Sequence, residues 1–208
     1  MIYSLHNMRV DITQTERKVF MHKENLSAAE ALEKLKEGNK RYLASDTNPG
    51  DISPKIRQVT CDEGQSPYAI VVTCSDSRVI PEGIFSAGIG ELFVIRVAGN
   101  VMDNHQIGSV EYAAEHLGSK LLVILGHTHC GAVGATISSA PEGFVKTITD
   151  EIRKAIGDEK DEYKACCLNV ERSVNIVKES LSEMIEKGEL TVCGAVYHID
   201  NGEVEFLD

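Results

Sequence analysis

Residues 68–73 read Tyr-Ala-Ile-Val-Val-Thr, a continuous run of apolar and β-branched side chains. Such a run predicts a strand that is buried on both faces, as in a parallel sheet that helices cover on both sides. Residues 92–97 and 121–125 repeat the signal. Between these two strands, residues 105–117 carry apolar side chains on one helical stripe, and Gly118 follows as a stop signal. Strand, helix and strand in this order indicate a parallel crossover unit.

Elements on both sides of this unit extend the α/β pattern. Ser27 and Glu30 form a capping box, which predicts a helix over residues 28–43. Ser53 and Pro54 mark the start of a second helix. Further helices are predicted at 143–156 and 164–187, and strands at 190–198 and 204–207 with a hairpin turn at 200–202. The predicted fold is α/β: a mainly parallel sheet flanked by helices, with a C-terminal edge hairpin.

The composition is that of one globular domain. The chain has 208 residues, of which 42% are hydrophobic and 25% are charged, and it contains no repeat or low-complexity linker. That length suits a single compact domain. We expect residues 26–208 to form this domain. Residues 1–25 are polar and weakly patterned, so we expect them to be an N-terminal extension.

Charge and hydropathy exclude several classes of partner. The formal net charge is −11, which argues against nucleic acid and anionic membranes, because both require a basic face. No apolar run reaches the roughly 20 residues of a membrane span, and the N-terminus lacks the pattern of a signal peptide. We therefore expect a cytoplasmic protein. Its six cysteines should serve in metal binding, redox chemistry or packing rather than in disulfides.

Three metal-binding side chains follow two of the predicted strands. Cys74 comes directly after residues 68–73, while His127 and Cys130 follow residues 121–125. The carboxyl ends of parallel strands meet at one edge of a sheet, so these loops can come together. Two thiolates and one imidazole suit Zn²⁺, and three protein ligands with a fourth position open are typical of a catalytic zinc site. The alternative is that both cysteines are ordinary core residues.

Asp76 and Arg78 lie just beyond the first of these ligands. In a metal site they would form a charge-assisted pair that positions Asp76 beside the ion. Without a metal they would be a surface ion pair of little energetic value. His129, next to the second ligand loop, is predicted to be a solvated loop histidine. Packing roles are predicted for the other cysteines, Cys61, Cys166, Cys167 and Cys193.

The chain resembles the β-class carbonic anhydrases. The resemblance covers about residues 28–207, and its most specific parts are Cys-Ser-Asp-Ser-Arg at 74–78 and Gly-His-Thr-His-Cys-Gly at 126–131. Further matching segments lie at 64–67, 93–100, 108–117 and 194–197. The resemblance implies reversible hydration of CO₂ to bicarbonate and a proton by zinc-bound hydroxide, with one Zn²⁺ per chain.

The same resemblance implies a role for each matching residue. Cys74, His127 and Cys130 match the family's zinc ligands. Asp76 and Arg78 match its catalytic dyad, in which Asp76 orients the hydroxide and Arg78 keeps Asp76 ionised and off the metal.

The resemblance also implies a homodimer or a higher homo-oligomer. Gln65 matches a glutamine that hydrogen-bonds substrate, and Phe93 and Tyr112 match residues that line the pocket. Gly131, directly after the last ligand, is placed with these substrate-binding residues. Because the family's active sites lie at a dimer interface, Gln65, Phe93 and Tyr112 would serve the partner's zinc. The helix at 28–43 would be an N-terminal arm that packs on the partner.

One expectation concerns regulation. Part of the family closes its site by binding bicarbonate with a tryptophan, an arginine and a tyrosine. The arginine aligns with Arg96 and the tyrosine with Tyr197, but Val71 stands at the tryptophan position and the chain has no tryptophan. Valine offers no indole N–H donor. We therefore expect an open site, with Arg96 bound to a structural carboxylate or carbonyl.

Three other readings fit parts of the sequence. A similar fold could hydrolyse CS₂ or COS at the same site. A zinc-stabilised regulatory or binding module would show a closed site with four ligands. A thiol redox protein would favour a Cys-x-x-Cys motif, which this chain lacks.

Overall fold

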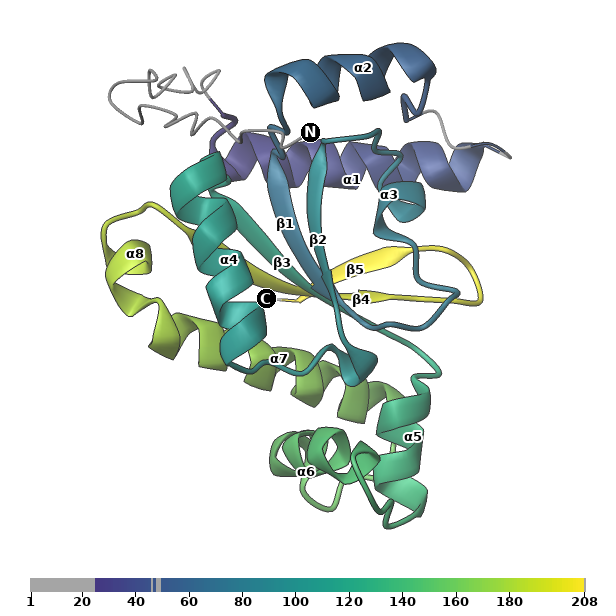
Figure 1. Cartoon of the computed structure of the whole chain (residues 1–208). Coiled ribbons are helices and arrows are strands. Elements are labelled where there is room, and N and C mark those ends of the chain that lie inside the picture. The colour runs from purple at the N-terminus through teal and green to yellow at the C-terminus, as the bar shows by residue number, and fades with distance from the viewer. Residues whose placement is uncertain (1–24, 46, 48–49, 208) are drawn as a thin grey trace, which may run out of the picture.

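The computed structural model describes residues 25–45, 47 and 50–207, so nearly all of the expected extension at 1–25 lies outside the described residues. The described chain contains a five-stranded sheet with the order β2-β1-β3-β4-β5 (Figure 1). The first four strands are parallel, and β5 runs antiparallel to β4. The strands are β1 (Ala69–Thr73), β2 (Leu92–Arg96), β3 (Leu121–His127), β4 (Thr191–Tyr197) and β5 (Val204–Leu207).

Helices cover both faces of this sheet. They are α1 (Ala28–Ala44), α2 (Pro54–Glu63), α3 (Pro81–Ile84), α4 (Asn104–Leu117), α5 (Gly131–Ser138), α6 (Val145–Ile156), α7 (Glu162–Ser180) and α8 (Ser182–Glu186), with a short 3₁₀ turn, η1 (Ala98–Asn100). Figure 1 shows α1, α2 and α3 on one side of the sheet, and α4, α7 and α8 on the other. Helices α5 and α6 lie beyond the carboxyl ends of the central strands. The predicted α/β class and the mainly parallel sheet are confirmed.

The central strands are buried on both faces, as the sequence predicts. Every residue of β1 and of β3 is buried. Successive side chains of β1 point to opposite faces, because a strand has a period of two residues. Val71 packs in one core cluster with Leu35 of α1, and Ile70 packs in the other with Val110 of α4. The sheet therefore fixes the carboxyl ends of β1 and β3 rigidly between two hydrophobic layers.

Local signals account for where several helices begin and end. The side chain of Ser27 accepts a hydrogen bond from the amide of Glu30, and the Glu30 carboxylate accepts one from the amide of Ser27 at 2.9 Å. This capping box starts α1. Gly118 ends α4 with a φ of 70°, a left-handed conformation that glycine adopts without strain. One prediction is wrong in part: the helix expected at 164–187 is two helices, because the backbone leaves helical geometry at Leu181 (φ −116°, ψ 31°).

The side chain of Asn39 joins α1 to distant parts of the chain. Its Nδ2 donates to the carbonyl of Ile84 at 3.2 Å and to that of Gly202 at 3.0 Å. Its Oδ1 accepts from the amide of Val204 at 3.1 Å. Helix α1 is thus held on its own sheet by Asn39, as well as by its buried apolar face. The expectation that this helix also packs on a partner remains a prediction.

No helix in the described part of the chain combines the length and the apolar character that crossing a membrane requires.

Candidate metal centre

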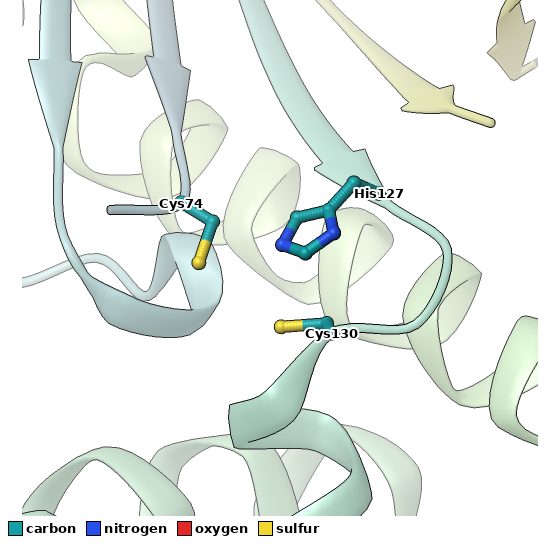
Figure 2. A group of neighbouring side chains, drawn as sticks. All are labelled: Cys74, His127 and Cys130. Carbon is teal, nitrogen blue, oxygen red and sulfur yellow. The ribbon is translucent and has the colours of Figure 1, made fainter. Parts of the chain in front are cut away.

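The sheet brings the three candidate metal ligands, two cysteine sulfurs and one histidine nitrogen, together at one edge. Cys74 directly follows β1, and His127 is the last residue of β3, which pairs with β1 in parallel. Cys130 is the N-cap of α5, after a tight loop in which His129 has a φ of 55°. Figure 2 shows the three side chains pointing toward one common space. Their ligand atoms all lie within 4.8 Å of one another, and all three residues are buried. Neighbouring strands thus unite residues that are far apart in the sequence.

His127 carries the clearest sign of a metal. Its Nδ1 lies 2.9 Å from the carbonyl oxygen of Thr128, which can only accept, so Nδ1 is the protonated nitrogen. The other nitrogen, Nε2, then presents a lone pair toward the two cysteines. His127 is 1% exposed, and Nε2 is buried without a hydrogen-bond partner among the described residues. A buried polar atom without a partner costs free energy, and a cation at this point would satisfy it.

The two cysteine thiols are electrostatically coupled. A hydrogen bond with Cys130 is the main contact that lowers the pKa of Cys74, to about 4, despite its burial. The same hydrogen bond, together with burial, raises the pKa of Cys130. The pair therefore readily holds one thiolate. A divalent cation between the sulfurs would favour the thiolate form of both, because a coordinating thiol is deprotonated.

Asp76 and Arg78 form a bidentate ion pair at the rim of this cluster. Arg78 Nε donates to Asp76 Oδ1 at 3.0 Å and Nη2 donates to Oδ2 at 2.8 Å. The amide of Arg78 also donates to Oδ1 at 2.9 Å. The Arg78 side chain holds the pKa of the Asp76 carboxyl well below its usual range, so Asp76 is ionised at neutral pH. Arg78 Nη2 further donates to the carbonyl of His129 at 3.1 Å, which ties the two ligand loops together.

Arg96 stabilises the first ligand loop from the end of β2. Its Nε donates to the carbonyl of Cys74 at 3.2 Å, and its Nη2 donates to the carbonyl of Asp76 at 2.6 Å. These are the carbonyl partners that the sequence led us to expect. Val71 is fully buried, and the hydroxyl of Tyr197 lies 3.1 Å from that of Tyr42. Arg96 and Tyr197 are thus both engaged by protein groups.

The predicted substrate-binding residues fall into two groups. Gly131 follows Cys130 directly and starts α5 beside the cluster. Phe93 pairs in register with Ile70, four positions before Cys74, which places it roughly 13 Å back along the sheet at 3.3 Å per residue. The ring of Tyr112 lies against Phe93, with 6.1 Å between ring centroids, and Gln65 precedes β1. Within one chain, Phe93, Tyr112 and Gln65 therefore lie toward the amino ends of the strands, whereas the candidate metal ligands lie at the carboxyl ends.

The remaining histidine and cysteine predictions have mixed outcomes. The side chain of His129 is 65% exposed, as expected for a solvated loop histidine, with Nδ1 3.9 Å from Glu162. Cys166 is buried and Cys193 half-buried, both packed in core clusters. The packing role predicted for Cys61 is wrong, because Cys61 is exposed on α2, a helix without a buried residue.

Two residues behind the cluster, Gly99 and Asn169, received no role in the sequence predictions, although Gly99 lies in the matching segment 93–100. The amide of Gly99 donates to Cys74 Sγ at 3.2 Å, and Asn169 Nδ2 donates to the carbonyl of Gly99 at 2.7 Å. A signal for Asn169 exists in the sequence, because it interrupts an apolar stripe of the α7 helix. A buried amide at such a position indicates a specific hydrogen-bond partner.

A chain whose parallel sheet presents two cysteines and one histidine at its carboxyl edge is an α/β protein with side chains that could hold a metal ion. A family model described as carbonic anhydrase matches residues 69–204. The chain belongs to the carbonic anhydrase family, and its structural neighbours place it in the β class.

Individual relatives agree with this assignment. The chain is 36% identical over 195 residues to the carbonic anhydrase of Mycolicibacterium smegmatis, and this match covers 87% of this chain and 94% of the relative. It is 32% identical over 198 residues to carbonic anhydrase 2 of Mycobacterium tuberculosis, covering 88% and 95%. A tetrameric β-carbonic anhydrase of Sordaria macrospora superposes with a TM-score of 0.65 at 27% identity, covering 74% of this chain and 87% of that one. The Coccomyxa β-carbonic anhydrase superposes with a TM-score of 0.62 at 28% identity, covering 76% of this chain and 86% of that one.

Proposed function

We propose that this enzyme binds one Zn²⁺ through Cys74, His127 and Cys130 and hydrates CO₂ reversibly to bicarbonate and a proton. The observation that carries the proposal is Nε2 of His127, which is buried, faces two cysteine thiols and has no hydrogen-bond partner in the described part of the chain. Two sulfurs and one imidazole nitrogen suit zinc, and three protein ligands leave one coordination position for chemistry. All six cysteines are free, which fits a reducing compartment such as the cytoplasm.

Zinc and the protein divide the chemistry between them. When bound, Zn²⁺ would act as a Lewis acid that lowers the pKa of a water molecule to about 7, which makes hydroxide available near neutral pH. Asp76 would accept a hydrogen bond from this hydroxide and so orient it toward the carbon of CO₂. Asp76 can do so because Arg78 keeps it ionised. The two bonds from Arg78 also hold both carboxylate oxygens, which would keep Asp76 away from a bound metal ion.

The proposal predicts metal content and turnover in the same sample. The purified protein should contain about one zinc per chain and should hydrate CO₂ in a stopped-flow pH-indicator assay. A chelator should abolish the activity, and added Zn²⁺ should restore it. Full zinc without CO₂ hydration would instead support the non-catalytic binding module. Assays with CS₂ and COS in competition with CO₂ test the hydrolase alternative.

We also propose that the active site is completed by a second copy of the chain. Phe93, Tyr112 and Gln65 lie toward the sheet edge opposite their own ligands, so a partner in the reverse orientation would bring them to its zinc. The solved relative from Sordaria macrospora is tetrameric. A two-fold interface exchanges such residues reciprocally.

Subunit complementation tests this arrangement. Asp76→Asn and Gln65→Ala proteins should each be poorly active alone. If Gln65 serves the partner's zinc, one of the two sites in each mixed dimer is wild type. Random mixing makes about half of the dimers mixed, so it should restore about a quarter of wild-type activity. The mixed dimers are made by unfolding and refolding the two variants together. Each variant unfolded and refolded alone is the control. Activity that stays at the level of the single variants, or a fully active monomer in sedimentation, would contradict a shared site.

A further inference from the structure

The 3₁₀ turn η1 forms the wall behind the first ligand. Gly99 in this turn has a left-handed backbone (φ 67°, ψ 17°), and its amide donates to Cys74 Sγ. A side chain at this position would collide with Ile152 of α6, because an added Cβ would lie 2.7 Å from its Cδ1. The turn is therefore shaped so that one specific N–H group reaches the sulfur.

Asn169 holds the other side of the same residue. Its side-chain amide crosses from α7 and donates to the carbonyl of Gly99 at 2.7 Å. Asn169 is 2% exposed and lies on the buried face of α7, beside Val170. Gly99 is thus fixed from both ends: its N–H bonds to the ligand sulfur, and its C=O bonds to a rigid helix.

We propose that Asn169 is a positioning residue for the metal centre. By fixing the left-handed backbone of Gly99, it directs the Gly99 N–H at Cys74 Sγ and so sets both the place of this sulfur and its electron density. The inference rests on the proposed zinc site. Groups that orient a metal's direct ligands typically change metal affinity by roughly 10–100-fold when they are removed.

A purely structural role makes a different prediction. Asn169 could serve only to satisfy a buried carbonyl, in which case its loss would destabilise the protein with and without metal alike. Ser173 provides a matched comparison on the next turn of α7. It is also 2% exposed, and its Oγ lies within hydrogen-bond distance of two carbonyls, that of Asn100 in the same 3₁₀ turn at 3.1 Å and that of Asn169 one helical turn back at 3.0 Å. Among the described residues, no hydrogen bond joins Asn100 to Cys74 Sγ.

The test compares Asn169→Leu with Ser173→Ala in the full chain. Leucine has the same number of side-chain heavy atoms as asparagine and a higher helix propensity, but it is bulkier and lacks the donor. Three measurements are made on each protein: zinc affinity by chelator competition, the thiolate-to-cobalt charge-transfer band of the Co²⁺-loaded protein, and thermal unfolding with and without metal. Asn169→Ala, which leaves a smaller side chain, is the second variant in case leucine prevents folding.

We expect Asn169→Leu to bind zinc roughly 10–100-fold more weakly than the wild type. Its charge-transfer band should move to longer wavelength, because a sulfur that has lost an N–H donor releases its electrons more easily. Ser173→Ala should keep the wild-type affinity and band even if it melts at lower temperature. An unchanged band and affinity in both Asn169 variants, or equal changes in Ser173→Ala, would overturn the inference. A wild-type protein that binds neither Zn²⁺ nor Co²⁺ would overturn the proposed function itself, and this inference with it.

Discussion

Cys74→Ser, His127→Ala and Cys130→Ser are each expected to lose most of their zinc and nearly all CO₂ hydration. The reason is the donor count: each change leaves two protein ligands where the proposed site has three, in a cluster whose ligand atoms lie within 4.8 Å of one another. Serine is a hard, weakly acidic donor that cannot replace a thiolate for zinc. His127→Ala also removes the lone pair at the buried Nε2.

Metal analysis and stopped-flow assays on the same preparations provide the measurement. Cys166→Ala is the matched control, because Cys166 is buried in the same hydrophobic cluster without belonging to the ligand set. It should keep zinc and activity, with only a loss of stability from the missing sulfur. Full zinc in all three ligand variants would disprove the assigned site.

Asp76→Asn is expected to keep its zinc and to hydrate CO₂ roughly 10²–10⁴-fold more slowly. Asparagine preserves the shape of the side chain but not the anion that accepts from the attacking hydroxide. Arg78→Ala should also lose activity for a different reason: Asp76, freed from its bidentate partner at 2.8 Å and 3.0 Å, could then bind the metal. The two variants should therefore differ in metal coordination although both are slow.

The control for Asp76→Asn is Glu162→Gln, the same chemical change in a carboxylate that lies 3.9 Å from His129 near the second ligand loop. It should hydrate CO₂ at nearly the wild-type rate. The Co²⁺ spectrum separates the two slow variants, since only Arg78→Ala should gain a protein oxygen as fourth ligand. Near wild-type turnover in a zinc-loaded Asp76→Asn protein would show that Asp76 is not catalytic.

Much of this site could be predicted because its geometry follows from strand pairing. Buried runs at 68–73 and 121–125 predicted strands, and parallel strands place their following loops together, which is where Cys74 and His127 lie. The Asp76–Arg78 pair was also within reach, since two residues on one loop interact locally. In each case, the signal lay in a short stretch of sequence.

What could not be predicted depends on packing between distant elements. Helix α5 carries two glycines, which lower helix propensity, so its helical pattern is weak. Cys61 sits on a helix whose start is predicted by Ser53 and Pro54, but these signals cannot reveal that none of the residues of this helix is buried. The bond from Asn169 to Gly99 spans 70 positions, and only the finished fold brings these residues together.

Asn39 also bears on how the protein is made. The backbone groups that its side chain contacts lie 45, 163 and 165 positions further along the chain. During synthesis, Asn39 leaves the ribosome well before two of these three partners, which emerge 163 and 165 residues later. Contacts of such long range form slowly, because a large loop must close first. Until the C-terminal hairpin arrives, the apolar face of α1, with Ala31 and Leu35, remains available to other nascent chains or to chaperones.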